Sequence, residues 1–323
     1  MIRNLRQEPG FYRRLAALAL PLILQNLITT SLGFVDTFMV GLLGNEELSA
    51  VTAANTPIFL VQVIVFGLMS GLTVLASQYW GRSDTVSINR CMGVAMYAGL
   101  LVSSLMALLL WLAPLPVMGL VTDNARLIEL GAPYLKIVGP SYIFNSVSSV
   151  YVSMQRSTEN PQLGLKIFGA SMLLNTFLNY CLIFGHFGAP ELGISGAAIA
   201  TLCSRVAEFL IVAVYAAVNK RVPLNIPALL HPGFGYVKSF LTYSAPVILN
   251  ETLWGLGTST MTAIMGHMRI STEMLSAYAI MGNIDKFSTV PASAWLGPRR
   301  SSWASASAKA PTGRRYTAWG CAC

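Results

Sequence analysis

The segment Leu20-Pro21-Leu22-Ile23-Leu24-Gln25 recurs 225 residues later as Ala245-Pro246-Val247-Ile248-Leu249-Asn250. Leu48-Ser49-Ala50 likewise recurs as Leu275-Ser276-Ala277, at an offset of 227 residues. Self-similarity at so long a period is typical of a membrane transporter built from two related bundles of helices. The second copy begins late in a chain of 323 residues, so we expect one complete bundle and the start of another.

The composition is that of a membrane protein. Charged residues make up 11% of the chain and hydrophobic residues 54%, whereas a soluble domain carries roughly 25% charged residues. No segment has the period-two alternation of a membrane β-barrel, so we predict an all-α polytopic membrane protein. A run of roughly 20 apolar residues spans a bilayer. Such runs occur near 15–43, 50–80, 92–113, 133–154, 164–187, 192–218, 239–266 and 274–290.

Lys and Arg are unevenly distributed among the segments between these runs. Eleven lie in the N-terminal segment and the even-numbered loops, whereas the odd-numbered loops hold only Arg126 and Arg269, with Lys136 at a helix start. Because basic residues are retained on the cytoplasmic side, we predict a cytoplasmic N-terminus in a multi-pass protein of the plasma (inner) membrane. The net charge of +8 reflects this bias and a basic tail, so nucleic acid is not an expected partner.

We predict four parts along the chain. Residues 1–218 form a six-helix N-terminal lobe, 219–238 a cytoplasmic linker, and 239–290 two helices of an incomplete C-terminal lobe. Residues 291–323 are rich in Ala, Ser, Gly, Arg and Trp and contain no acidic residue. Translation in the wrong reading frame is the favoured explanation of this tail, and a natural, basic, disordered segment is the alternative.

Asp36 is an acidic residue inside the first apolar run. A carboxylate costs about 2.5–3.5 kcal/mol at the centre of a membrane helix, which favours a functional role over a packing role near the helix end. Its polar and small neighbours recur at steps of three and four residues, which predicts one inward-facing polar stripe. The stripe consists of Gln25, Asn26, Thr29, Thr30, Gly33, Asp36 and Thr37.

Three further polar residues lie in later helices. Asn175 and Asn179 are four residues apart and share a face of the fifth helix, and Thr201 follows the small-residue run 196–200. With Asp36 they supply oxygen ligands for Na⁺, whereas a protonated Asp36 would donate a hydrogen bond to an amide. We therefore expect Na⁺ or H⁺ as coupling ion, with no other metal and no cofactor. For the asparagines alone, hydrogen bonding between helices is favoured over ion ligation, and for the small-residue run alone, close helix packing is favoured over a site.

The second copy of the repeat adds another acid and another proline. Glu251 lies five residues after Pro246 and is a candidate for a cation site in the second lobe. Pro21 and Pro246 occupy matching places and each removes a backbone hydrogen bond, which predicts a bend in both helices. Arg205 and Glu208, three residues apart in the sixth helix, are predicted to neutralise each other.

In their order and spacing, the motifs of residues 11–290 resemble the MATE family, the multidrug and toxic compound extrusion antiporters. The motifs are Leu20-Pro21 with Gln25, Val35-Asp36-Thr37-Phe38-Met39-Val40-Gly41, Leu48-Ser49-Ala50, Gln78-Tyr79-Trp80-Gly81-Arg82, Gln155-Arg156-Ser157-Thr158-Glu159-Asn160-Pro161, Leu174-Asn175-Thr176-Phe177-Leu178-Asn179-Tyr180-Cys181-Leu182-Ile183-Phe184-Gly185, Gly196-Ala197-Ala198-Ile199-Ala200-Thr201, and Pro246 with Glu251.

The resemblance implies twelve helices in two six-helix lobes, and export of cationic, lipophilic compounds in exchange for sodium or protons. It implies a transporter, not an enzyme, that acts as a monomer in contact with membrane lipid. By the resemblance, Asp36, Asn175, Asn179 and Thr201 match the N-lobe cation or proton site. Glu251 matches the acid of the C-lobe site and Pro21 the proline that kinks the first helix. Some members have an aspartate at the position of Asn179, so a neutral residue here lowers the charge of the site.

Two copies of a 225-residue unit need about 450 residues, so we expect a chain truncated by about four helices, which puts its own transport activity in question. A flippase for lipid-linked saccharides is one alternative, but it needs several basic residues facing a pyrophosphate, and only Arg205 and Lys286 lie deep in predicted helices. An intramembrane prenyl transferase needs clustered carboxylates for magnesium, and the sequence has no Asp-x-x-Asp pair. An inert membrane fragment is the remaining alternative.

Overall fold

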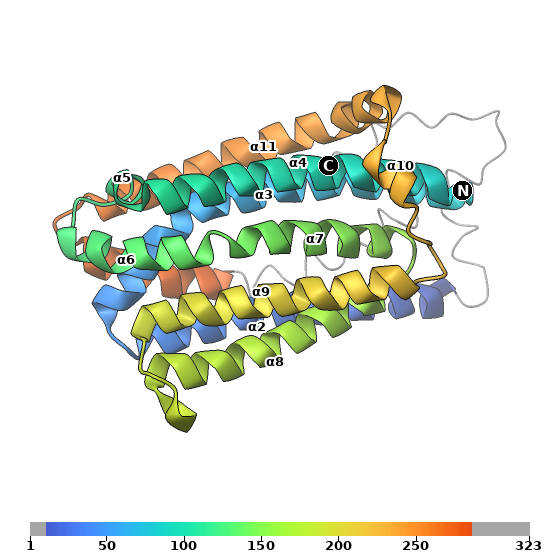
Figure 1. Cartoon of the computed structure of the whole chain (residues 1–323). Helices are drawn as coiled ribbons and strands as arrows, with labels where there is room; N and C mark the ends of the chain where they lie inside the picture. Colours follow the sequence, from blue (N-terminus) through green and yellow to red (C-terminus); the bar gives the residue numbers. More distant parts are fainter. Residues whose placement is uncertain (1–10, 286–323) are drawn as a thin grey trace.

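The computed structural model describes residues 11–285, and this part of the chain contains helices and no strand. Figure 1 shows the long helices lying side by side along a common direction. They are α2 (Phe11–Gly41), α3 (Asn45–Gly81), α4 (Thr85–Leu112), α5 (Pro114–Gly119), α6 (Ala125–Val138), α7 (Ser141–Ser157), α8 (Pro161–Phe184), the short 3-10 helix η1 (His186–Gly188), α9 (Gly193–Val218), α10 (Ile226–Leu230) and α11 (Phe234–Gly266). A further helix occupies residues 271–285.

Each of the eight predicted apolar runs corresponds to helical structure as far as residue 285, but two differ from the prediction. The run 133–154 is divided between α6 and α7, because Pro140 has no N–H to donate and follows Gly139 at the end of α6. Helix α3 has 37 residues and is therefore about 55 Å long, which exceeds the thickness of a bilayer. The predicted tail 291–323 lies outside the described residues.

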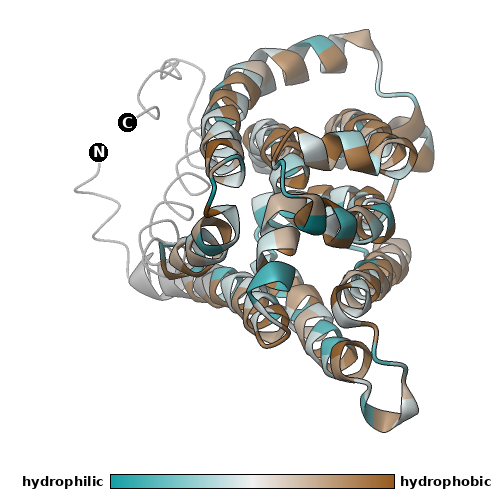
Figure 2. Ribbon diagram, turned by 90° about the vertical axis from the view of Figure 1, so that its left-hand side faces the viewer, coloured by the Kyte–Doolittle hydropathy of each residue, from teal (hydrophilic) through white to brown (hydrophobic). Residues whose placement is uncertain are grey.

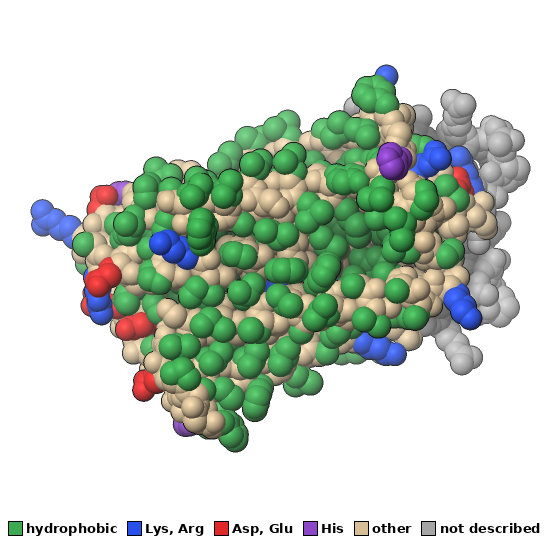
Figure 3. Space-filling view, in the orientation of Figure 1, with side chains coloured by type: hydrophobic (Ala, Val, Ile, Leu, Met, Phe, Trp, Pro, Cys, Tyr) green, Lys and Arg blue, Asp and Glu red, His purple; other side chains and the backbone are tan. Residues whose placement is uncertain are grey.

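The described helices have the apolar exterior of a membrane protein. Four of them, α3, α4, α8 and α9, are long and apolar enough to cross a bilayer. Figure 2 shows hydrophobic residues over much of each helix, and Figure 3 shows most charged side chains near the two ends of the bundle. Large side chains such as Leu101, Trp111 and Leu173 are exposed, which suits contact with lipid rather than water.

Polar residues at the helix starts supply hydrogen-bond acceptors for free backbone N–H groups. The side chain of Asp84 accepts hydrogen bonds from the Ser87 backbone at 3.0 Å and the Ser87 hydroxyl at 2.6 Å, and it caps α4. These bonds favour the ionised carboxyl and hold the pKa of Asp84 below its usual value of 3.8. Asn124 and Asn225 cap α6 and α10 in the same way.

Small residues allow the backbones of neighbouring helices to approach closely. A Cβ atom at Gly196 of α9 would lie 2.4 Å from the carbonyl oxygen of Leu182 on α8, so only glycine fits there. This contact confirms the packing role predicted for the small-residue run. Gly71 of α3 meets Ser244 of α11 equally closely, and α11 packs along α3 over much of its length.

The predicted linker 219–238 is partly helical and ends earlier than expected. It contains α10, and α11 already begins at Phe234, after Gly233 with a φ of 81°. Asn89 of α4 holds the linker through two backbone groups: its Nδ2 donates to the Pro223 oxygen at 3.1 Å, and its Oδ1 accepts from the Asn225 N–H at 3.3 Å. This segment is therefore attached to α4.

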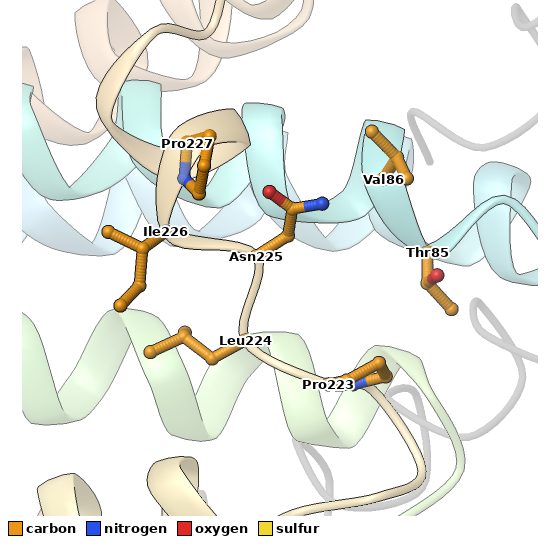
Figure 4. A pocket seen from close by; sticks show the side chains of 7 residues that line it. All are labelled: Thr85, Val86, Pro223, Leu224, Asn225, Ile226 and Pro227. Carbon is orange, nitrogen blue, oxygen red and sulfur yellow. The ribbon is translucent and has the colours of Figure 1, made fainter.

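A hollow of about 360 Å³ lies between this linker and the start of α4 (Figure 4). Its lining comes from Thr85, Val86 and residues 223–227, and none of these side chains is charged. It contains none of the predicted site residues, so we assign it no role in ion coupling.

Candidate functional site

The structure joins Asp36, Asn179 and Asn175 in one hydrogen-bonded chain across two helices. The Asn179 Nδ2 donates to Asp36 Oδ1 at 2.5 Å and to Asn175 Oδ1 at 3.1 Å. Asp36 lies on α2 and both asparagines lie on α8, which packs along α2. The spacing of four residues places the two amides on one face of α8, as the sequence predicted.

The side chains of this hydrogen-bonded chain are largely buried. Asn175 and Asn179 are buried, at 2% and 0% exposure, and Asp36 is partly buried. Both N–H groups of the Asn179 amide are used, but its Oδ1 is buried and has no hydrogen-bond partner within residues 11–285. A buried acceptor without a donor costs free energy, and it is suited to receive a proton donor or a cation.

The other predicted site residues are not part of the hydrogen-bonded network of Asp36, Asn179 and Asn175 in the described part of the protein. Thr201 of α9 is partly buried, and its hydroxyl makes no hydrogen bond to Asp36, Asn175 or Asn179 in the described part of the protein. Glu251 is partly buried on α11, and Pro246 of the same helix is exposed. Pro21 lies buried within α2.

The predicted polar stripe of α2 does not face inward along its whole length. Gln25 is buried, but Thr29 is exposed and its hydroxyl donates to the Gln25 carbonyl of its own helix at 2.9 Å. A hydroxyl can be satisfied in this way by the preceding turn, so it does not need an inward position. Thr37 does reach another helix, because its hydroxyl accepts a hydrogen bond from Asn283 Nδ2 at 2.9 Å.

The ion pair predicted on α9 is present and buried. Arg205 Nη1 donates to Glu208 Oε2 at 2.7 Å, which confirms the predicted pairing, and Glu208 is fully buried. Thr201 and Arg205 are four residues apart and so share one face of α9.

The arrangement suits monovalent cation or proton binding better than a transition-metal site. Among residues 11–285 no group of three His, Cys, Asp or Glu side chains could hold a metal ion. The polar atoms near Asp36 are amide and carboxylate oxygens, which are ligands for hard cations such as Na⁺. This bundle of long apolar helices with an acid buried among amides defines a polytopic membrane transporter.

Comparisons with known proteins identify the family. The MatE family model matches residues 21–181. The chain is 32% identical over 198 residues to the probable multidrug resistance protein NorM of Rhizobium meliloti, covering 60% of this chain and 41% of that protein. It is also 32% identical over 195 residues to the multidrug resistance protein PmpM of Pseudomonas aeruginosa, covering 58% and 40%. The chain belongs to the MATE family.

Solved structures show the same fold. The MATE multidrug transporter DinF-BH in complex with R6G superposes with a TM-score of 0.84 at 18% identity, covering 92% of this chain and 66% of that one. A MOP superfamily transporter from Pyrococcus furiosus gives a TM-score of 0.79 at 17% identity, covering 92% and 65%. The chain thus matches about two fifths of the length of these curated relatives and about two thirds of the solved ones.

Proposed function

We propose that the chain is part of an antiporter that exports cationic, lipophilic compounds in exchange for Na⁺ or H⁺ by alternating access. The family and the multidrug resistance names of its relatives support export. The hydrogen-bonded chain from Asp36 through Asn179 to Asn175 is the observation that supports ion coupling. Because the chain covers only part of its relatives, the activity of the whole protein belongs to this proposal.

In this proposal Asn179 serves both states of Asp36. The ionised carboxylate accepts a hydrogen bond from Asn179 Nδ2. A protonated Asp36 instead donates a hydrogen bond and needs an acceptor. A cation bound to Asp36 needs a further oxygen ligand. A half-turn of the amide would present Asn179 Oδ1, which has no partner among the described residues. Binding of the coupling ion would thus change how α2 and α8 are held together.

Differential binding provides the coupling. A ligand shifts a conformational equilibrium only by the difference in its affinity for the two states. We propose that the coupling ion prefers the state in which Asp36 faces Asn179 Oδ1 and that a cationic substrate favours release of the ion. Thr201 is proposed as a further oxygen ligand, Glu251 as the acid of a second cation site, and Pro21 and Pro246 as bends.

The remaining features follow the family and the distribution of charge. We propose a monomer in the inner membrane with its N-terminus in the cytoplasm, in contact with lipid along its exposed apolar helices. The basic residues that mark the cytoplasmic side include Arg82, Arg90 and Arg156. R6G, which is bound in the solved structure of a relative, is a suitable test substrate.

The test uses the intact gene product reconstituted in liposomes under an imposed Na⁺ or proton gradient. Efflux of R6G is measured for the wild type, for Asp36→Asn and for the control Asp123→Asn, whose carboxylate is 78% exposed outside the site. We expect Asp36→Asn to abolish gradient-driven efflux and Asp123→Asn to leave it unchanged. Equal efflux by Asp36→Asn and the wild type would refute the coupling role.

A further inference from the structure

The interface of α2 with α8 contains a buried glutamine whose amide makes no hydrogen bond. Gln25 is 1% exposed, and neither its Nε2 nor its Oε1 has a hydrogen-bond partner among residues 11–285. An amide side chain can donate two hydrogen bonds and accept two, so its burial without partners costs free energy. An apolar side chain would fill the same place without that cost, which indicates that the amide binds a ligand.

The amide of Gln25 lies where three helices meet. A Cβ at Gly164 of α8 would lie 2.8 Å from both Gln25 Nε2 and Gln25 Oε1, and also 2.8 Å from Val152 Cγ1 on α7. The missing side chain of Gly164 therefore makes room for the amide. Further along the same interface, a Cβ at Gly169 would lie 3.8 Å from Ile28 Cδ1 of α2. Figure 1 shows α2 and α8 side by side, in agreement with these contacts.

Two buried serines close to this junction also have free hydroxyls. Ser171 of α8 is 3% exposed and Ser148 of α7 is fully buried, and neither Oγ has a hydrogen-bond partner in the described part of the chain. A serine in a helix can donate to a carbonyl of its own preceding turn, as Ser103 does to Gly99 at 2.7 Å. Since Ser148 and Ser171 make no such bond within residues 11–285, both hydroxyls are available to a ligand.

These groups are aligned with the candidate ion site. Gln25 and Asp36 are eleven residues apart on α2, which is about three turns or roughly 16 Å. Gln25 meets α8 at Gly164, and Asp36 meets it at Asn179. Ser148 is four residues before Val152, so it shares that face of α7. On α8, steps of seven, four and four residues place one set on a single face: Gly164, Ser171, Asn175 and Asn179.

We propose that this interface is a hydrated path along which the coupling ion reaches Asp36 from the side of Gln25. Water molecules, with the cation or proton in passage, supply the hydrogen bonds that Gln25, Ser148 and Ser171 do not receive from the protein. Buried water typically makes about three hydrogen bonds to such groups. Neutral amides and hydroxyls suit passage, because they bind a cation more weakly than a carboxylate does and so allow it to leave. The inference rests on the proposed function of Asp36.

The test measures water access to single cysteines in the full chain, purified in nanodiscs. Ser171→Cys is made in a protein whose native cysteines are replaced by alanine, and a positively charged methanethiosulfonate labels it. The matched control retains only the native Cys91, which is 0% exposed and packs among apolar side chains. The thiolate is the reactive form and needs water around it, so we expect Ser171→Cys to react roughly tenfold or more faster than Cys91.

A second substitution tests the amide itself. Gln25→Leu has a similar size and no polar atom, so it is expected to exclude water and to slow labelling of Ser171→Cys to the rate of Cys91. The control Thr29→Val removes a hydroxyl that is exposed and already donates to the Gln25 carbonyl at 2.9 Å. Thr29→Val is therefore expected to leave the labelling rate unchanged.

The outcomes separate this inference from the proposed function, because labelling needs neither a gradient nor a substrate. Ser171→Cys that reacts as slowly as Cys91 overturns the hydrated path, whatever the efflux of Asp36→Asn. Fast labelling that Gln25→Leu does not slow overturns the passage beside Gln25. If Ser171→Cys does not fold, Ser148→Cys takes its place with the same expected rates. Fast labelling together with normal efflux by Asp36→Asn would support the hydration and refute only the coupling role.

Discussion

The close contact of α3 with α11 leads to a stability prediction for Gly71→Ala. A Cβ at Gly71 would lie 1.7 Å from Ser244 Oγ, 2.8 Å from Ser244 Cβ and 3.1 Å from Ser244 Cα. Rotation of the Ser244 side chain moves Oγ but leaves Cβ and Cα in place. Since real Cβ atoms essentially never approach another heavy atom within 3.0 Å, the helices must separate locally by a few tenths of an ångström.

The energetic estimate combines two opposing effects. Overpacking of a tight contact costs about 1–3 kcal/mol, and the close approach to the Ser244 Cβ and Cα, which side-chain rotation cannot move, indicates the upper part of that range. Alanine is better than glycine within a helix by roughly 0.5–1 kcal/mol. We therefore expect Gly71→Ala to lower the free energy of unfolding by about 2 kcal/mol.

The matched control is Gly257→Ala on α11, where a Cβ would meet nothing within 4 Å. This change retains the helix-propensity gain without a clash, so it is expected to be neutral or stabilising. The double variant Gly71→Ala with Ser244→Gly removes the clash with Oγ and Cβ and is expected to recover most of the loss. Its remaining cost comes from the 3.1 Å approach to the Ser244 Cα.

Thermal unfolding in detergent measures these differences with a thiol-reactive fluorescent dye. Cys91 and Cys181 are free and buried, so they become reactive only when the bundle opens. We expect a lower midpoint for Gly71→Ala and recovery in the double variant. A Gly71→Ala protein as stable as Gly257→Ala would show that α3 and α11 do not approach each other as described.

Two further predictions concern the N-terminal end of α4. Asp84→Ala should lower stability by about 1 kcal/mol at neutral pH through loss of the helix cap, with Asp84→Asn as the control that keeps an acceptor. Because the pKa of Asp84 is lowered by folding, this contribution is present above the unfolded value of 3.8 and is lost as pH falls through the folded pKa. The difference in thermal unfolding midpoint between the wild type and Asp84→Ala should therefore disappear at acidic pH. A difference that does not depend on pH would contradict the role of the ionised Asp84 as helix cap. Asn89→Ala removes both hydrogen bonds to the linker and should increase amide hydrogen exchange across 219–233, whereas Thr85→Ala should not. Unchanged exchange in Asn89→Ala would show that the linker is held by other contacts.

The family fold follows largely from the sequence. Apolar runs long enough to span a bilayer must form helices, because the backbone has no other hydrogen-bond partners there. The repeat around Pro21 and Pro246 indicated the class of transporter, and the spacing of Asn175 and Asn179 placed both amides on one face. These are local properties of a helix, which is why sequence alone could determine them.

Contacts between helices were decided only by the tertiary structure. The sequence named Asp36 and Asn179 as candidates, but their hydrogen bond joins residues 143 positions apart. It paired Arg205 with its neighbour Glu208 on the same helix, which the structure confirms. The tight approach of Gly71 to Ser244 was missed. This contact and the hydrogen bond between Asp36 and Asn179 depend on how helices rotate and pack against one another, which periodicity does not specify.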